Sequence, residues 1–501
     1  MTAEPQHFDV LIVGAGLSGI GAACHLRRRC PDKSFVILEG RDAIGGTWDL
    51  FRYPGIRSDS DMYTLGYSFR PWEEQKAIAD GPSILAYVRD TAREYDVDGN
   101  IRFRHRVARA RWSSERACWT VEADVEGSGE PAVFTCGFLF LCGGYYKYAA
   151  GYTPEFPGRE RYRGRVVHPQ HWSDDVEYAG KRVVVIGSGA TAVTLVPALA
   201  GSAAHVTMLQ RSPTYVVARP AVDAMAQKLR RYLPSKAAYA INRWKRILLG
   251  MYFYRVCRSD PDRAARMIRG GVRMALGPDY DVDKHFNPRY KPWDQRLCLV
   301  PDGDLFDSIR LGRASVVTDT IESFTETGVK LTSGAEIEAD LIVTATGLEL
   351  EVMNGLALSV DGESVEPGRL LTYKGMMYEG VPNLASAFGY TNASWTLKCD
   401  LTCEYVCRLL EYMDRHGYRR CVPRNGDPNV AQLPWVDFTS GYFQRAIDRL
   451  PKQGAKAPWR LYQSYVHDLA MLRFGRLDDG TMEFSGRFES QAGLGRSASA
   501  A

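Results

Sequence analysis

The feature that most constrains this chain is a strand–turn–helix unit that occurs twice. An apolar run at 9–13 leads into Gly14-Ala15-Gly16-Leu17-Ser18-Gly19 and then a helical pattern that ends at Arg29. A second apolar run, at 182–186, leads into Gly187-Ser188-Gly189-Ala190-Thr191-Ala192 and another helical pattern. Continuous apolar runs of this kind are typical of strands buried on both faces of a parallel sheet. The sequence therefore predicts an α/β fold with two Rossmann-like units.

The first unit carries the residue types that a dinucleotide pyrophosphate requires. Gly14 permits a tight turn, Gly16 lets the backbone approach the phosphates, and Gly19 lets the helix pack on the strand. The helix N-terminus offers free N–H groups and the positive end of its dipole. The next apolar strand ends at Glu39, whose carboxylate suits ribose hydroxyls and repels a 2′-phosphate. The alternative is a glycine turn without a ligand.

The segment that follows favours FAD over NAD. Gly45-Gly46-Thr47-Trp48 places two glycines beside an indole, and residues 53–59 form a second turn-rich segment, which suits a loop folded against a flat heteroaromatic ring. The alternative is a surface loop rich in glycine and proline. The residues expected to contact FAD are Gly14, Gly16, Leu17, Ser18, Gly19, Glu39, Gly46, Thr47, Trp48, Asp49, Arg57, Ser58, Asp59 and Val107.

The second unit differs from the first where the ribose is recognised. Its partner strand at 205–209 ends in Gln210-Arg211-Ser212 and lacks the acid that an NAD site would carry. The missing acid removes a repulsion, and Arg211 can pair with a 2′-phosphate, so the pattern favours NADPH. The alternative is a solvated surface arginine. The residues expected to contact NADPH are Gly187, Ser188, Gly189, Ala190, Thr191, Ala192, Arg211 and Ser212.

Composition narrows the class of protein further. The net charge of the 501 residues is +4, which requires no nucleic-acid partner. The 11 cysteines are scattered and form no metal-ligand or disulfide pattern, which indicates a reducing compartment and no metal site. The chain has no run of eighteen apolar residues, the length a membrane span needs. We therefore expect a cytoplasmic enzyme.

The order of patterns predicts six segments along the chain. A helix is expected at 396–415 with Gly417 as its C-cap, and a hairpin at 472–484 with its turn at Asp479-Gly480. The predicted division is an FAD-binding part at 1–150, an NADPH-binding part at 151–222, a helical insertion at 223–289, a second NADPH-binding part at 290–334, a second FAD-binding part at 335–486 and a disordered tail at 487–501.

The helical insertion is basic and rich in aromatic residues. Between Lys228 and Arg273 it has 13 lysines and arginines against two acids, Asp260 and Asp262. A basic, aromatic helix can lie on an anionic membrane surface, which would make the protein peripherally membrane-associated. The favoured alternative is that its apolar face lines the path of the substrate while its charges are solvated.

The linker between the two units resembles the fingerprint of type I Baeyer–Villiger monooxygenases, F-x-G-x-x-x-H-x-x-x-W-P/D. It reads Tyr162 to Ser173, with Tyr162 in place of Phe and Ser173 in place of Pro or Asp. The motifs at 45–48, 53–59, 340–347 and 389–396 match the same family, so the resemblance covers nearly the whole chain. The residues of these motifs are most similar to those of the subgroup that contains the mycobacterial thioamide-prodrug-activating enzyme.

This resemblance implies an activity and a catalytic residue. The family uses NADPH and O2 to convert ketones to esters or lactones through a C4a-peroxyflavin, retains NADP⁺ during the cycle, and also oxidises sulfides. Arg296 matches the arginine that stabilises the peroxyflavin anion, and Asp59 matches its aspartate partner. Gln295 stands where many relatives have a lysine for the NADPH phosphate, which leaves more of that contact to Arg211.

Two other activities fit the same residues. A flavin-containing monooxygenase would act only on soft nitrogen or sulfur nucleophiles and would not need Arg296. An NADPH:acceptor flavin reductase would have no oxygen chemistry. The pattern indicates neither the oligomeric state nor the natural substrate, and it predicts small-molecule ketones or sulfides as the substrate class.

Overall fold

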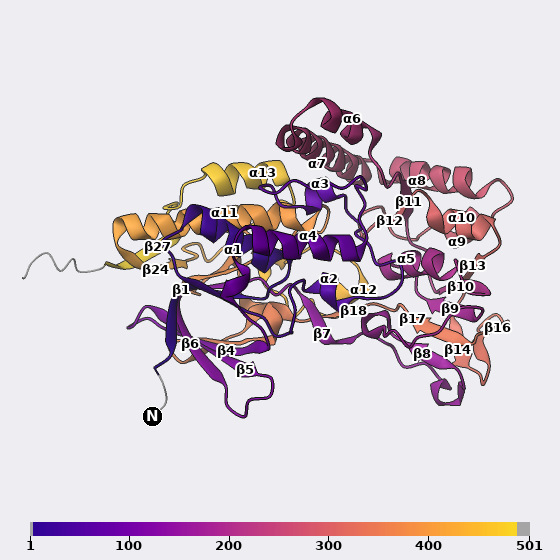
Figure 1. Cartoon of the computed structure of the whole chain (residues 1–501), viewed down its shortest axis with the longest axis horizontal. Helices are drawn as coiled ribbons and strands as arrows, with labels where there is room; N and C mark the ends of the chain where they lie inside the picture. The colour runs from indigo at the N-terminus through magenta and orange to yellow at the C-terminus, as the bar shows by residue number, and fades with distance from the viewer. Residues whose placement is uncertain (1–3, 488–501) are drawn as a thin grey trace, which may run out of the picture.

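Two sheets with parallel strands at their centres form the framework of the chain, as the twin glycine units predict. The structure is a computed structural model and describes residues 4–487. In Figure 1 the first sheet lies at the lower left, the second sheet at the right, and the helical insertion along the upper edge. The predicted α/β class with two Rossmann-like units is confirmed.

The first sheet has nine strands and is assembled from distant parts of the chain. Its order is β20-β19-β4-β5-β6-β1-β2-β3, with β23 also paired to β6. The central strands β6, β1 and β2 are parallel, whereas β4, β5 and β6 form an antiparallel meander. The strands are β1 (Gln6–Val13), β2 (Phe35–Leu38), β3 (Ile101–Arg102), β4 (His105–Ser113), β5 (Cys118–Val125), β6 (Ala132–Leu141), β19 (Ala357–Val360), β20 (Glu363–Val365) and β23 (Leu384–Ser386).

Three long helices pack around the central strands of this sheet and form one hydrophobic core with them. Val10 and Ile12 of β1 are fully buried, and they share this core with Ile20 of the first helix and Leu401 of the last. The glycine turn leads directly from β1 into the first of these helices. The helices are α1 (Leu17–Arg29), α4 (Gly81–Glu94) and α11 (Trp395–His416).

The second sheet is wholly parallel and has the order β13-β10-β9-β17-β8. Its helices are α5 (Ala190–Leu199) and α10 (Asp304–Arg310). The sheet corrects one predicted boundary, because β17 pairs with β9 in this sheet although residues from 335 onward were expected in the FAD-binding part. The chain therefore returns to the first sheet only after β17. The strands are β8 (Arg165–Val167), β9 (Arg182–Ile186), β10 (His205–Gln210), β13 (Ala314–Thr318) and β17 (Leu341–Thr344).

The insertion is helical, and it is anchored to both units. It comprises α6 (Ala224–Tyr232), α7 (Ser235–Ser259), α8 (Pro261–Leu276) and α9 (Val282–His285), between the paired strands β11 (Val216–Arg219) and β12 (Cys298–Pro301). Buried Arg243 of α7 pairs with Asp400 of α11 at 3.2 Å and donates to the carbonyl oxygens of Tyr63 and Gly66 at 2.9 and 2.7 Å. Val272 of α8 instead packs in the core of the second sheet.

The C-terminal part returns to the first sheet and covers it. Helix α11 ends at His416 and is followed by Gly417, whose φ of 70° is the left-handed conformation expected of a C-cap. The predicted hairpin at 472–484 is wrong, because residues 470–474 form a π-helical turn and β27 (Met482–Arg487) pairs with β24 (Tyr418–Pro423). The predicted tail lies outside the described residues except at Arg487.

The remaining short elements connect these layers. Strands β7 and β18 pair with each other, as do β21 and β22, and β25 and β26, whereas β14, β15 and β16 form a small antiparallel sheet. Among residues 4–487, no helix has the length and apolar content needed to cross a bilayer. The short elements are α2 (Thr47–Leu50), α3 (Met62–Leu65), α12 (Gly441–Gln444), α13 (Tyr465–Leu469), β7 (Tyr146–Gly151), β14 (Ile321–Phe324), β15 (Gly328–Leu331), β16 (Glu336–Glu338), β18 (Leu348–Leu350), β21 (Thr372–Tyr373), β22 (Met377–Tyr378), β25 (Gln432–Pro434) and β26 (Lys452–Gly454).

Candidate active site

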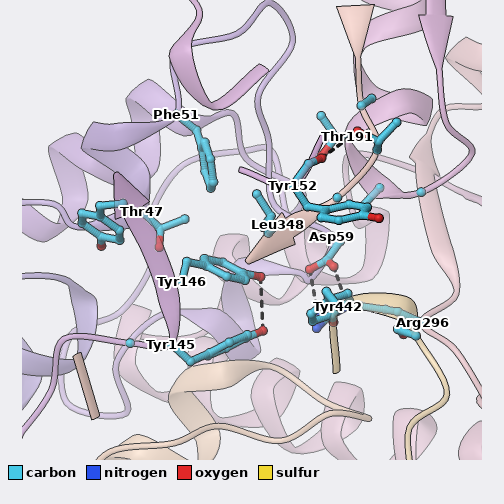
Figure 2. A pocket seen from close by; sticks show the side chains of 18 of the residues that line it. Thr47, Phe51, Asp59, Tyr145, Tyr146, Tyr152, Thr191, Arg296, Leu348 and Tyr442 are labelled. Carbon is cyan, nitrogen blue, oxygen red and sulfur yellow. Dashed lines mark hydrogen bonds and ion pairs between the residues drawn. The ribbon is translucent and has the colours of Figure 1, made fainter. Parts of the chain in front are cut away.

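One cavity of about 1280 Å³ brings the two glycine units together. It is larger than the range of about 300–1,000 Å³ typical of a site for one drug-sized ligand, so it has room for more than one. Figure 2 shows part of its wall, where Thr47 and Thr191 come from the two different units. Because both units open into this cavity, ligands bound at the two glycine turns would meet inside it.

The first glycine turn has the geometry of an anion site. Gly14 has φ of 98°, and a Cβ there would lie 2.7 Å from the Cα of Gly143, so only glycine fits. Gly16 caps α1 without a side-chain hydrogen bond, and the first turn has no acid. The N–H groups of this turn are therefore free for an external anion. Gly19 does not line the cavity; a Cβ there would lie 1.8 Å from the Gly14 oxygen, which fits its expected packing role.

Glu39 lies where the ribose of a dinucleotide is expected. Its Oε2 accepts a hydrogen bond from the Ala15 N–H at 2.6 Å, and its Oε1 accepts one from the Arg41 N–H at 2.9 Å. Burial raises the pKa of this carboxyl, against the opposing effect of the two N–H donors. Glu39 thus fixes the glycine loop to the end of β2 and still lines the cavity.

The second glycine turn repeats this geometry in the other sheet. Gly187 has φ of 136°, and Gly189 caps α5 with no side-chain acceptor and no acid in the first turn. Space above Gly189 is open, because no atom would lie within 4 Å of an added Cβ. Ala192 is buried and does not line the cavity. The expected residues that do line it here are Gly187, Ser188, Gly189, Ala190, Thr191, Arg211 and Ser212.

Arg211 is the free cation of this cavity. Among its lining arginines, Arg211 alone makes no ion pair or hydrogen bond with residues 4–487. It is exposed and directly follows β10, as an arginine for a 2′-phosphate should. Ser188 Oγ donates to the Ser212 carbonyl oxygen at 3.0 Å and thereby holds this segment against the second glycine turn.

The expected pair of Arg296 and Asp59 is confirmed. Arg296 Nε lies 2.6 Å from Asp59 Oδ2, and Arg296 Nη2 donates to Asp59 Oδ1 at 3.0 Å, as the dashed lines in Figure 2 mark. Burial disfavours the charged guanidinium, but the Asp59 carboxylate and the nearby Tyr145, Tyr442 and Tyr146 together outweigh this effect and hold the pKa of Arg296 above its ordinary value. The pair unites the loop after α2 with the segment before β12.

Three tyrosines near this pair were not predicted. Tyr145 and Tyr146 follow the end of β6, and their hydroxyl oxygens lie 3.2 Å apart. Tyr442 comes from α12 and stands beside the pair in Figure 2. Trp395 stacks on Tyr145 with ring centroids 5.1 Å apart. The two tyrosines could have been found, because ligands of such sheets bind at the carboxyl ends of the strands; the segment of Tyr442 carries no signal of this kind.

Of the other residues expected to contact FAD, most line the first cavity and Asp49 does not. Asp49 does not line the cavity; it is buried and pairs with Arg41 at 2.6 Å and with Arg89 at 3.0 Å. Arg57 lines the cavity and also forms a bidentate pair with Asp304 of α10, which joins the two units. The expected FAD contacts that line the cavity are Gly14, Gly16, Leu17, Ser18, Glu39, Gly46, Thr47, Trp48, Arg57, Ser58, Asp59 and Val107.

The fingerprint segment, Tyr162 to Ser173, forms hydrogen bonds with the backbone on either side of β17. His168 Nδ1 accepts from the Gln170 N–H at 3.2 Å, so its Nε2 donates to the Gly347 carbonyl oxygen at 3.1 Å. Burial lowers the pKa of His168, which favours this neutral form. Tyr162 OH donates to the Ala339 carbonyl oxygen at 2.9 Å. The segment therefore holds the point where β17 ends and the chain crosses to the first sheet.

A second cavity, of about 1300 Å³, adjoins the first at the Arg296–Asp59 pair. Both cavities are lined by Asp59 and Arg296, and α7 forms much of the wall of the second through residues 245–259. The pair therefore stands between the cavity of the glycine turns and a cavity under the insertion. This is the position that a group acting on both a cofactor and a substrate requires.

Known proteins resemble this chain along nearly its whole length. Residues 8–229 match the family model described as flavin-binding monooxygenase-like. The chain is 54% identical over 483 residues to the FAD-containing monooxygenase EthA of Mycobacterium tuberculosis, which covers 96% of this chain and 98% of that protein. It is 45% identical over 481 residues to the probable FAD-binding monooxygenase AlmA of Acinetobacter baylyi, with 96% of each chain covered.

Solved structures with the same fold contain bound NADP. An oxidized steroid monooxygenase bound to NADP has a TM-score of 0.75 at 23% identity and covers 96% of this chain and 99% of its own. A cyclohexanone monooxygenase from a Rhodococcus species, bound to NADP⁺, has a TM-score of 0.74 at 21% identity with the same coverage. The uncapped helix N-termini of α1 and α5 fit such nucleotides.

Proposed function

The chain belongs to the flavin-binding monooxygenase-like family and is an FAD-containing, NADP-utilising monooxygenase; on this premise we propose that it carries out Baeyer–Villiger oxidation. In this reaction a ketone, O2, NADPH and a proton give an ester or lactone, NADP⁺ and water. One oxygen atom enters the bond beside the carbonyl carbon, and the other leaves as water. Sulfides would accept one oxygen atom in the same way and give sulfoxides.

The two glycine units would hold the two cofactors. The N-terminus of α1 with Glu39 suits FAD, and the N-terminus of α5 with Arg211 suits NADPH. Bound FAD supplies hydride acceptance from NADPH and activation of O2. NADP⁺ retained in the first cavity would fill space there. Together with the aromatic residues around Tyr146, it would exclude water from the reacting atoms.

The observation that carries the proposal is the Arg296–Asp59 pair at the junction of the two cavities. A guanidinium here can stabilise the negative charge that develops on the carbonyl oxygen of a ketone in the second cavity. Asp59 holds the guanidinium through two contacts and keeps it charged. An oxidant of soft nitrogen or sulfur nucleophiles alone would not need such a charge.

The test is the Arg296→Ala variant, assayed with a linear ketone and an aryl methyl sulfide. Loss of one preorganised donor typically lowers kcat by about 10²–10³-fold, so ester formation should fall by at least that factor. NADPH consumption should continue, with hydrogen peroxide in place of ester. The matched control is Arg231→Ala, which removes the same charge from an exposed position on α6 outside both cavities.

The outcomes separate three activities. If the variant still forms ester at the rate of the control, Arg296 does not have the proposed role. If the unmodified enzyme oxidises sulfides but no ketone, the protein is an N- or S-monooxygenase, an alternative that the relatives' names as FAD-containing monooxygenases also permit. If NADPH is consumed with an artificial acceptor and no O2 is used, it is a flavin reductase.

We also propose that the insertion contacts anionic membranes. Five large apolar side chains on α6 and α7 are between 54% and 70% exposed: Met225, Tyr232, Leu248, Leu249 and Tyr252. Exposed apolar residues interspersed with basic ones are typical of interfacial helices. The enzyme should pellet with vesicles that contain anionic lipid, and less so as salt is added or after Leu248→Ser. The absence of pelleting at low salt would leave only the role of the helices in the second cavity.

A further inference from the structure

The second cavity carries more positive charge than the chemistry at Arg296 requires. Its lining residues include six cationic and three anionic side chains. The walls between these charges are largely apolar, with side chains such as Ile78, Val217 and Leu397. The charged residues are Arg219, Lys245, Arg246, Arg255, Arg258 and Arg296, against Asp59, Asp61 and Asp223.

Most of these cations already have carboxylate partners. Asp59 is taken up by Arg296, and Asp223 accepts from both Lys245, at 2.8 Å, and Arg246. Asp223 also caps α6 through the Ala226 N–H at 3.0 Å. Its oxygens are therefore fully used, and this single carboxylate compensates only one of the two positive charges of Lys245 and Arg246.

Two of these cations, Arg219 of β11 and Arg255 of α7, have no such partner among the described residues. Arg219 is the one that shares a strand with Val217 of the apolar wall. Among the residues that the structure describes, no carboxylate lies within ion-pair distance of its guanidinium, and no hydrogen bond to its side chain is formed. Asp61 is the nearby acid, but its Oδ1 accepts from the Thr64 N–H at 3.2 Å as the cap of α3. Burial raises the pKa of Asp61, against the opposing charges of Arg246 and Arg219.

The strand geometry sets where Arg219 stands. Side chains alternate along β11, so Val217 and Arg219 share the face that lines the second cavity, whereas Val216 packs in the core of the second sheet. Val216 pairs with Cys298 of β12, so Arg219 lies three residues further along the sheet, or about 10 Å. Arg296 precedes Cys298 by two residues, and the two arginines thus mark separate ends of this wall.

Arg219 also belongs to this cavity alone. It does not line the first cavity, so it is not placed to bind the phosphates of either nucleotide. A guanidinium beside an apolar wall binds a carboxylate well, because two parallel N–H donors match its two oxygens. A ligand that satisfies both the wall and the arginine needs an apolar body and one anionic end.

We propose that Arg219 binds the carboxylate of the substrate, so that the enzyme prefers oxo carboxylic acids in which an apolar segment separates the ketone from the acid. This inference rests on the proposed function. The carbonyl group would lie at Arg296 and the carboxylate at Arg219, with the methylene segment along Val217 and Leu299. Arg219 is then a specificity-determining residue with no contact to the reacting atoms.

The test compares a medium-chain oxo acid with its methyl ester, which has nearly the same shape and no charge. Both are assayed for product with the unmodified enzyme, Arg219→Gln and Arg231→Gln. The unmodified enzyme should favour the acid. In Arg219→Gln the acid-to-ester ratio of kcat/KM should fall about tenfold, the factor that corresponds to about 1.4 kcal/mol, mainly through KM for the acid.

The control and a binding measurement make the result decisive. Arg231→Gln removes the same charge from the insertion outside the cavity and should keep the ratio of the unmodified enzyme. An unreactive fatty acid of the same length should inhibit competitively more than the matching alcohol, and Arg219→Gln should remove that difference. This second readout applies equally if the enzyme oxidises sulfides and not ketones.

Two results would overturn the inference. One is an acid-to-ester ratio that is the same in Arg219→Gln and in the unmodified enzyme. The other is a fatty acid that inhibits no better than the alcohol. By contrast, failure of the enzyme to oxidise any ketone, while the fatty acid still inhibits through Arg219, would refute the proposed Baeyer–Villiger activity and leave the anion site in place.

Discussion

Replacement of Arg211 by glutamine should convert the enzyme from NADPH preference toward equal use of NADH. Arg211 follows β10 at the wall of the first cavity and has no ion pair or hydrogen bond with residues 4–487. Its guanidinium therefore needs to break no existing contact before it binds the 2′-phosphate. Glutamine keeps a polar amide on a shorter side chain and removes both the charge and the forked N–H donors.

The size of the effect follows from the exposure of the residue. A hydrogen bond to a charged group contributes about 1.5–3 kcal/mol, and solvent screening at an exposed position reduces this. A loss near the lower limit, about 1.4 kcal/mol, corresponds to a tenfold decrease in kcat/KM for NADPH. The change should appear mainly in KM, because the contact is the same before and during hydride transfer.

The assay measures kcat/KM for NADPH and for NADH in the unmodified enzyme and in Arg211→Gln. NADH has no 2′-phosphate, so its value should change little. The reverse change is Gln295→Lys, which adds a cation to the same cavity and should lower KM for NADPH further. If Arg211→Gln lowers both values equally, the residue supports the fold of the site and does not recognise the phosphate.

Two further predictions concern the framework. Asp400→Asn leaves Arg243 buried without its carboxylate and should destabilise the protein by about 3–5 kcal/mol at neutral pH, measured by urea unfolding. Burial opposes the charge of Asp400, but its contacts with His25 and Arg243 outweigh burial and hold the pKa of Asp400 below the ordinary value. The Asp400 carboxylate therefore contributes to the free energy of unfolding above about pH 4. The difference in stability between the unmodified protein and Asp400→Asn should shrink as the pH falls below that value. Gly19→Ala places a Cβ 1.8 Å from the Gly14 oxygen and should yield protein with less bound FAD by flavin absorbance, whereas Gly99→Ala, with no atom within 4 Å, should retain it.

Local patterns predicted the parts of the site that depend on backbone conformation. The glycine turns and the end of β2 at Glu39 are encoded by a few adjacent residues, and both sheets contain them as expected. Asp49 shows the limit of this reasoning. It stands next to the Gly46-Thr47-Trp48 loop in the sequence, but its side chain turns away from the cavity toward two arginines.

Long-range placement could not be predicted in the same way. An apolar strand such as β17 fits the parallel part of either sheet, and only its pairing with β8 and β9 decides which one. Tyr442 reaches the cavity from a short helix whose sequence has no turn or cap pattern that points there. The Arg296–Asp59 pair was expected only because the chain resembles a known family, since 237 positions separate the two residues.

The first sheet has a consequence for how the protein is made. Its β1–α1–β2 unit, with the glycine turn, is complete when residue 38 has been synthesised. Strands β19, β20 and β23 and the covering helix α11, however, come from the second half of the chain. The second sheet, by contrast, needs nothing beyond β17. During synthesis the second sheet can therefore fold on the ribosome first, whereas the first sheet can be completed only after α11 has been made. Capture of FAD would then be among the last steps of maturation, and a premature stop before residue 384 would remove flavin binding while the flavin motif itself stays intact.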